Sequence, residues 1–371
     1  MSWPTQALID LFGIEHPIIQ APMAGASNAV LASAVSNAGA LGGFGGTDST
    51  PDELREVIRA IRQKTSRPFV INLYLDRPQP YVPVAEHEAA LRAALAPVHS
   101  KLNAGEVPDP IDPFGNFDNQ IAIVIEERVP VLSSHFGAPE AKHMRALKAN
   151  GTRVIATATT ANEARQLASA GVDAIIAQGN EAGGHRGTFA APSRQAEIGT
   201  MALVPQIVDA VSVPVIAAGG IMDGRGIAAA LMLGAGGVQM GTAFVPCPET
   251  AANPAYVRSL LAAASGDAVL TDAVSGRPAR VLRNELVDLL EQHQDHRLAF
   301  PEQLSMTRNL RKAASSIGNA SFLPMWAGQG VALARAMPAA ELVNRLVGEA
   351  QKLLWPNHAN TSIAVLNGLV A

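Results

Sequence analysis

The feature that most constrains the fold of this chain is a repeated alternation of short apolar segments with segments of helical periodicity. The apolar segments are five or six residues long and lie at 16–21, 40–44, 68–73, 130–134, 153–158, 173–177, 213–218 and 236–240. Strands that alternate with helices in this way indicate parallel βα units. Eight such units within about 250 residues predict a closed (β/α)8 barrel, the TIM barrel, in preference to an open doubly wound sheet.

Two parts of the chain interrupt the repeat. Residues 76–117 place seven prolines around one alanine-rich helix, predicted over 84–95, and we expect them to form an insertion that acts as a lid. Residues 264–371 are expected to form a mostly helical cap and a final helix, over about 339–354, that returns to the barrel. Residues 1–75 and 118–263 then make up the cofactor-binding barrel.

The composition argues against several functional classes. A net charge of −4 without long basic runs predicts no binding to nucleic acid or to a membrane surface. The single Cys247 excludes an intramolecular disulfide, and the spacing of the histidines predicts no metal site. The N-terminus lacks the pattern of a signal peptide, and no apolar run reaches the roughly 18 residues of a membrane span. We therefore expect a cytoplasmic protein, with a homodimer as one open arrangement.

The most distinctive segment reads I-I-A-Q-G-N-E-A-G-G-H-R-G, at 175–187. It begins as a buried strand, breaks at Gln178, and then supplies glycines and polar side chains, as active-site loops of parallel α/β folds do. Gly183 and Gly184 expose backbone N–H groups that a flat or anionic ligand could approach. His185 has an unperturbed pKa of about 6.5 and could exchange protons near neutral pH. An ordinary βα turn with a surface histidine is the alternative.

Other strand ends add to this set. Gly219–Gly220 and Gly241–Thr242 follow the last two strands, where barrels often hold a phosphate group, and a helix starting at Gly224 would add N–H donors. Asn72 and Gln178 end two other strands, and their amides could bind a flavin or simply connect parts of the barrel. Ser133–Ser134 lacks a nucleophile elbow, which leaves hydrolase chemistry poorly supported.

Two histidines are expected at the same mouth of the barrel. His135 ends the fourth predicted strand, and His185 follows the sixth. Because the carboxyl ends of barrel strands meet at one face, both imidazoles would point into one site. A purely structural role for His135 stays open.

Six motifs occur together along nearly the whole chain: Q-A-P-M-A-G at 20–25, S-S-H-F-G at 133–137, A-Q-G-N-E-A-G-G-H-R-G at 177–187, A-A-G-G-I-M-D-G-R-G at 217–226, V-Q-M-G-T-A-F at 238–244 and W-A-G-Q-G at 326–330. In this combination the sequence resembles the nitronate monooxygenases, formerly called 2-nitropropane dioxygenases. The resemblance is closer to the first class of that family than to the related quinone and enoyl reductases.

The resemblance implies a TIM barrel that binds FMN noncovalently. It implies oxidation of alkyl nitronates, and in a wider interpretation of nitroalkanes, by O2 to a carbonyl compound and nitrite, without NAD(P)H. His185 matches the catalytic histidine of the family, with His135 beside it. The implied cofactor residues are Ala21, Pro22 and Met23 along the flavin ring, Asn72 and Gln178 at its polar edge, Gly183 with its neighbour Gly184, Gly219, Gly220, Gln239, Gly241 and Thr242 around the ribityl phosphate, and Gln329 closing over the flavin.

Three functions stay open on the sequence alone. They are a nitronate monooxygenase, an NAD(P)H-dependent flavin reductase of quinones or enoyl thioesters on the same barrel, and a non-catalytic barrel that binds a flavin or phosphoester. His185 could hold an anionic nitro group when protonated, or remove the α-proton of a nitroalkane as a neutral base.

The substrate chamber departs from the family pattern at one place. Relatives often carry tyrosines in the stretch that here reads A-F-P-E-Q-L-S-M-T-R-N-L, whereas this chain has Phe300 and Leu304. We therefore expect an apolar chamber that favours short alkyl nitronates.

Overall fold

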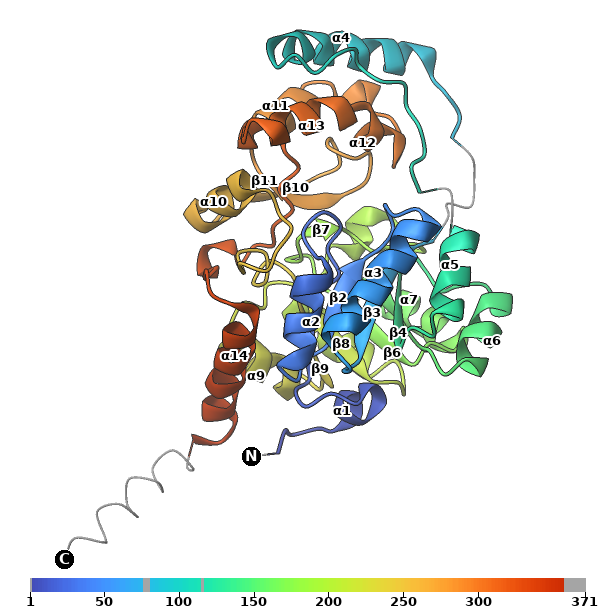
Figure 1. Ribbon diagram of the computed structural model, residues 1–371, viewed down its shortest axis with the longest axis vertical. Coiled ribbons are helices and arrows are strands. Elements are labelled where there is room, and N and C mark those ends of the chain that lie inside the picture. Colours follow the sequence, from blue (N-terminus) through green and yellow to red (C-terminus); the bar gives the residue numbers. More distant parts are fainter. Residues whose placement is uncertain (1, 76–80, 115–116, 357–371) are drawn as a thin grey trace, which may run out of the picture.

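The computed structural model describes residues 2–75, 81–114 and 117–356 (Figure 1). Residues 76–80, 115–116 and 357–371 lie outside the described residues. The parts of the predicted insertion and of the C-terminal cap that fall there stay predictions.

Eight parallel strands form the central sheet, in the order β1-β9-β8-β6-β5-β4-β3-β2. The two outer strands meet, because Ile19 and Leu41 form a parallel bridge and the N–H of Gln20 donates to the carbonyl of Leu41 at 2.9 Å. The sheet therefore curls into a nearly closed barrel, which confirms the prediction. The strands are β1 (Ile18–Gln20), β2 (Gly42–Gly45), β3 (Phe69–Tyr74), β4 (Val131–His135), β5 (Arg153–Ala158), β6 (Ala174–Gln178), β8 (Val215–Ala218) and β9 (Gly237–Met240).

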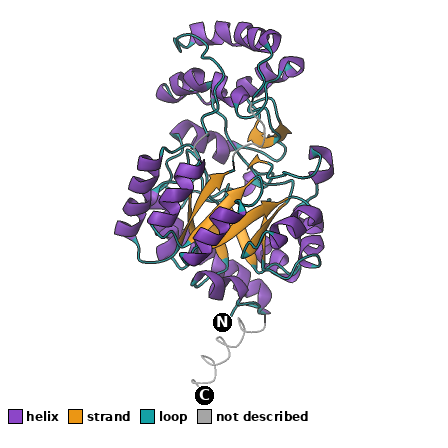
Figure 2. Cartoon of the chain, turned by 90° about the vertical axis from the view of Figure 1, so that its right-hand side faces the viewer, coloured by secondary structure: helices purple, strands orange, loops and turns teal. Residues whose placement is uncertain are grey.

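Helices cover the outside of this barrel (Figures 1 and 2). They are α2 (Ala29–Asn37), α3 (Pro51–Lys64), α5 (Phe117–Glu126), α6 (Ala141–Ala149), α7 (Ala161–Ser169), α8 (Thr200–Val208), α9 (Gly224–Met232) and α14 (Ala339–Leu354). Helix α14 comes from the far end of the chain and packs against α9 and α2, completing the ring. Among the described residues, no helix has the length and apolar character that crossing a membrane requires.

The start of α3 shows how local sequence fixes these elements. Thr50 caps the helix by accepting a hydrogen bond from the N–H of Glu53, and the Glu53 carboxylate accepts one from the N–H of Thr50 at 2.8 Å. Pro51 occupies the first turn, where its missing N–H costs no hydrogen bond. This capping box fixes the start of the helix at Pro51.

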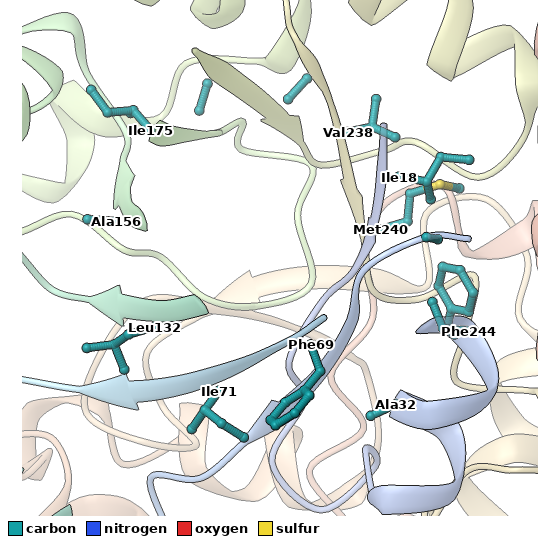
Figure 3. Close-up of a cluster of buried hydrophobic side chains, with 14 of the residues drawn as sticks. Ile18, Ala32, Phe69, Ile71, Leu132, Ala156, Ile175, Val238, Met240 and Phe244 are labelled. Carbon is teal, nitrogen blue, oxygen red and sulfur yellow. The ribbon is translucent and has the colours of Figure 1, made fainter. Parts of the chain in front are cut away.

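Alternate residues of most strands enter two separate cores. Ile71, Leu132 and Ile175 point outward and pack under the helices, in the cluster drawn in Figure 3. Their neighbours Val70 and Val131 point inward and fill the barrel with other aliphatic side chains. Helix α1 (Ala7–Phe12) adds Leu8 and Phe12 to this inner core, on the side away from the cap. The period of two thus seals the amino-terminal end of the barrel and leaves the opposite end for a site.

The cap stands over the carboxyl ends of the strands (Figures 1 and 2). It contains α10 (Pro254–Ala262), β10 (Ala268–Thr271), β11 (Ala279–Leu282), α11 (Glu285–Glu291), α12 (Glu302–Met306) and α13 (Arg308–Ser316). Helices α11, α12 and α13 were expected here, whereas α10 lies in the range that the sequence assigned to the barrel. The three-stranded antiparallel sheet β10-β11-β7 was not expected. Strand β7 is only Gly184–His185, too short to carry a periodic signal.

The predicted insertion supplies α4 (Ala85–Lys101), which is longer than expected because it continues through Pro97. Leu91 and Leu95 of α4 pack in the same apolar cluster as Leu310 of the cap, so the described part of the insertion packs on the cap. Figure 1 shows α4 at the end of the molecule farthest from α1. A lid function for this segment stays a prediction.

Candidate active site

A cavity of about 620 Å³ lies between the carboxyl ends of the barrel strands and the cap. Residues from the ends of seven strands, β1, β3, β4, β5, β6, β8 and β9, reach it, together with Trp326 and side chains of α13. Almost all the residues selected from the sequence line this one cavity: Ala21, Pro22, Met23, Asn72, His135, Gln178, Gly183, Gly184, His185, Gly219, Gly220, Gln239, Gly241 and Thr242. Their meeting follows from the fold, because parallel strands of a barrel end at the same face.

Gln329 is the exception. Its side chain is exposed, and it does not line the cavity. Its backbone N–H donates to the carbonyl of Glu181 at 2.9 Å. The residue therefore connects the chain after Trp326 to the loop between β6 and β7 through its backbone.

Residues 325–330, here called the strap, cross from the cap to the barrel. The strap is held by the N–H of Gly328, which donates to Oγ1 of Thr242 at 2.9 Å, and by the hydroxyl of Tyr256, which donates to the carbonyl of Trp326. Gly183 lies against it: a Cβ atom there would be 2.7 Å from the Gly328 nitrogen and 2.8 Å from the Ala327 carbonyl carbon. Only glycine allows this approach without moving backbone.

The glycine turns after β8 and β9 offer backbone donors. Gly219 and Gly220 have φ values of 115° and 71°, which favour glycine. Among the described residues, the N–H groups of Gly220 and Thr242 have no hydrogen-bond partner. They could therefore bind a phosphate.

The prediction of further donors at Gly224 was wrong. The N–H of Gly224 donates to the carboxylate of Glu349 at 3.1 Å, and Asp223 caps the next N–H, that of Arg225, at 2.9 Å. A helix N-terminus that already carries two carboxylates does not attract a third anion. The α8 start is occupied in the same way, since Glu181 accepts from the N–H of Thr200 at 2.9 Å.

The amide side chains divide into two groups. Gln178 is committed internally: its Nε2 donates to the His185 carbonyl at 2.9 Å, and its Oε1 accepts from the N–H of Gly187 at 2.8 Å. Nδ2 of Asn72 donates to the carbonyl of Ser133 at 3.1 Å. Gln239 differs, because its Oε1 is buried without a hydrogen-bond partner among the described residues. A buried acceptor without a partner is costly, so a ligand with an N–H or O–H donor fits here.

His135 is held at both ring nitrogens. Its Nδ1 lies 3.1 Å from Oγ1 of Thr157, and its Nε2 lies 3.3 Å from the carbonyl oxygen of His185. A carbonyl only accepts, so Nε2 carries the proton and Nδ1 accepts from the threonine hydroxyl. Neither nitrogen is left to bind a ligand, and His135 therefore orients the chain around His185.

Both histidines are neutral at neutral pH. Burial, reinforced by the Arg277 guanidinium, lowers the pKa of His135 to about 3. Burial also lowers the pKa of His185 to about 3, with further contributions from His135 and Arg277. Of the two roles that the sequence left open for His185, this environment favours the neutral base.

These lowered pKa values predict acid sensitivity. Below about pH 6.5 the unfolded chain binds protons at His135 and His185 that the folded chain refuses, so the free energy of unfolding should fall as pH drops from about 6.5 toward 3. Thermal denaturation between pH 8 and 4 measures this loss. The melting temperature of His135→Asn should fall less steeply with decreasing pH than that of the wild type. If the melting temperatures of the two proteins fall in parallel, the lowered pKa of His135 is contradicted.

An aromatic wall surrounds the two imidazoles. The Tyr74 ring stacks on His135 at 5.3 Å, and the rings of Phe300 and Trp326 lie 4.9 Å and 5.0 Å from His185. Burial raises the pKa of Tyr74, so its hydroxyl stays protonated and can donate. Tyr74 and Trp326 line the cavity, and so does Leu304, one of the two residues on which the expected apolar chamber rested. Phe300 is not a lining residue and contacts the site through the His185 ring. Tyr74 also adds a hydroxyl that the sequence did not single out.

The cavity also carries positive charge. Arg308, Arg311 and Lys312 of α13 line it, together with Asp48. Protein around the Asp48 carboxyl raises its pKa, and Arg311 opposes this shift. Three cations and one carboxyl among the lining residues suit an anionic ligand. The cavity is therefore apolar beside His185 but not throughout.

The residues that sequence reasoning missed come mainly from the cap and from strand interiors. Ser275 and Arg277 lie in the turn between β10 and β11, and Thr157 lies inside β5. The only signal for Thr157 was its place one residue before the end of a predicted strand. The turn residues carried no local signal.

The fold and the cavity define an enzyme class built on a (β/α)8 barrel, with the candidate active site at the carboxyl ends of the strands. A family model described as nitronate monooxygenase matches residues 5–349. The chain belongs to the nitronate monooxygenase family, and it is an oxidoreductase.

Individual relatives support this family membership. A nitronate monooxygenase from Pseudomonas aeruginosa is 45% identical over 350 residues, covering 93% of this chain and 99% of the relative. A probable nitronate monooxygenase from Staphylococcus haemolyticus is 41% identical, covering 95% and 99%. The solved structure of nitroalkane oxidase from Streptomyces ansochromogenes has a TM-score of 0.85 and 39% identity, covering 93% of this chain and 98% of that one. FabK from Thermotoga maritima is more distant in fold, with a TM-score of 0.74 and 33% identity over 100% of both chains.

Proposed function

We propose that the protein oxidises alkyl nitronates, and nitroalkanes after removal of their α-proton, with O2 and FMN, giving a carbonyl compound and nitrite. The observation that carries the proposal is a neutral histidine, His185, on the wall of a cavity that is apolar beside it and is also lined by three cationic side chains. A base, an apolar reaction chamber and positive side chains match a small organic substrate that becomes an anion.

The residues present fit FMN. The buried Oε1 of Gln239 needs a donor, which an isoalloxazine N–H supplies. The N–H groups of Gly220 and Thr242, which have no partner among the described residues, suit its phosphate, and Pro22 and Met23 line the cavity at the end of β1. When bound, FMN would supply the electron acceptor for the oxidation.

The chain itself would bind the substrate, move one proton and exclude water. His185 would accept the α-proton of a nitroalkane, and the Tyr74 hydroxyl would donate a hydrogen bond to the anionic nitro oxygens that result. The rings of Phe300 and Trp326, packed on His185, would keep water from the reacting carbon.

The purified protein is expected to be yellow and to release free FMN on heat denaturation. It should consume O2 and release nitrite when given a short alkyl nitronate, followed with an oxygen electrode and a colorimetric nitrite assay. A colourless protein that cannot be reconstituted with FMN would contradict the cofactor.

Anaerobic addition of NADH separates the competing function, an NAD(P)H-dependent flavin reductase. Rapid bleaching of the bound flavin by NADH, without nitrite release from nitronates in air, would favour the reductase. We expect slow or no bleaching.

A further inference from the structure

The position of His185 is set by a turn of the cap. His185 belongs to β7, which pairs with β11 so that His185 lies opposite Ala279. The turn that joins β10 to β11, residues 272–278, therefore stands beside the imidazole. Within this turn the fully buried hydroxyl of Ser275 lies 3.0 Å from Nε2 of His185.

The hydrogen bonds of Ser275 decide which nitrogen of His185 carries the proton. Its hydroxyl also lies 3.0 Å from the carbonyl oxygen of Arg277, which can only accept. Because a hydroxyl has one hydrogen, Ser275 donates to that carbonyl and presents a lone pair to Nε2. Nε2 must then be the protonated nitrogen of the neutral ring.

The other ring nitrogen is consequently the basic one. Nδ1 of His185 has no hydrogen-bond partner among the described residues. This atom is also not fully buried. Since His185 lines the cavity, this nitrogen opens onto it. A ring with the opposite tautomer would present an N–H there and could not take a proton.

We propose that Ser275 is a positioning residue that fixes His185 in the Nε2–H tautomer and so directs the basic Nδ1 at the substrate. The inference rests on the proposed function, in its reaction with nitroalkanes. In that step the C–H bond breaks, its electron pair stays on the substrate as the nitronate, and the proton forms a bond to Nδ1. The imidazolium keeps its Nε2–H bond to Ser275 throughout.

The turn is built to hold the serine still. Gly276 has a φ of 83°, and a Cβ there would lie 2.4 Å from the carbonyl oxygen of Leu298 and 2.7 Å from the nitrogen of Phe300. Gln303 donates to the carbonyl of Ala273 at 2.7 Å, and Arg277 donates to the carbonyl of Thr188. The same segment that packs on the turn carries the Phe300 ring against His185. Serine, imidazole and ring are therefore fixed as one unit.

The direct test is the tautomer of His185, read by 15N NMR of the FMN-loaded protein labelled at histidine, with His185→Asn used to assign the signal. The wild type should show Nε2 protonated and Nδ1 unprotonated. Ser275→Ala should give a mixture of the two tautomers. Thr157→Val, which removes the hydroxyl beside His135, should change the His135 signal and leave that of His185 as it was.

Kinetics supply the second measurement. Ser275→Ala should lower kcat for nitroethane about tenfold, the usual effect of one lost hydrogen bond, with little change in KM or in the rate with ethylnitronate. Ser275→Thr, which keeps the hydroxyl, should recover the wild-type tautomer and most of the rate. A wild-type spectrum with the proton on Nδ1, or an unchanged tautomer and kcat in Ser275→Ala, would overturn the inference. The predicted tautomers in a protein that releases nitrite from neither substrate would support the assignment of Ser275 and contradict the proposed function alone.

Discussion

Changing His185 to asparagine is expected to lower the turnover of nitroalkanes by about 10²–10⁴, the usual contribution of a general base. A neutral nitroalkane must lose its α-proton before it can be oxidised, and asparagine cannot accept it. The lowered pKa of His185 keeps its lone pair free at neutral pH, and the anion that forms beside the ring raises that pKa while the proton moves. A preformed nitronate needs no base, so its oxidation should lose far less, about ten- to a hundredfold through weaker binding.

Initial rates of nitrite release with nitroethane and with ethylnitronate measure this difference. The flavin absorbance of each preparation checks that the His185→Asn protein still holds FMN. Equal losses on both substrates would show that His185 binds the anion and is not a base. No loss on either would remove His185 from the reaction altogether.

The barrel could be predicted because its signals are local. Every predicted barrel strand is present, with ends shifted by at most two residues, since a strand such as Arg153–Ala158 is a short apolar run bounded by turn residues. The residues at the strand ends met in one cavity for the same reason: topology alone brings Met23, His135 and Gly219 together once the barrel closes.

Hydrogen-bond partners could not be predicted in this way. Asn72 and Gln178 were equally compatible with a ligand and with internal bonds, and the structure commits Gln178 to its own loop. The helix start at Gly224 looked available until Glu349, 125 residues away, was placed on it. Which acceptor takes an N–H depends on the folded conformation, even for partners as close in sequence as Gln178 and His185.

The cap shows most clearly which contacts the sequence could not predict. Ser275 lies in the stretch T-D-A-V-S-G-R-P, which predicts a turn and nothing about its neighbours. It reaches His185 only because a two-residue strand pairs with β11, and the two residues are 90 positions apart. Pairings of this kind depend on the assembled fold, so the sequence identified the histidine and missed the group that sets its tautomer.

Changing Gly183 to alanine is expected to weaken FMN binding at least a hundredfold. The new Cβ would fall 2.7 Å from the Gly328 nitrogen and 2.8 Å from the Ala327 carbonyl carbon, so backbone must move. Gly328 is bonded to Thr242 at 2.9 Å, and the next residue is bonded to Glu181 at 2.9 Å. Overpacking costs about 1–3 kcal/mol and each lost hydrogen bond about 1 kcal/mol, which together amount to roughly a hundredfold or more.

Gly184→Ala is the matched control, because it adds the same methyl group one residue later. Gly184 has a φ of 75°, but no atom of the described residues lies within 4 Å of its Cβ position, so the change costs only backbone strain of about 1–2 kcal/mol. Titration of each FMN-free variant with FMN, followed by flavin fluorescence, gives the two dissociation constants, and thermal denaturation without FMN gives the loss of stability. If Gly183→Ala weakens FMN binding no more than Gly184→Ala does, FMN binding does not depend on the close approach of the strap to Gly183. A much larger loss at 183 would mean that the cofactor site depends on the strap, a cap segment that packs directly against the loop carrying His185.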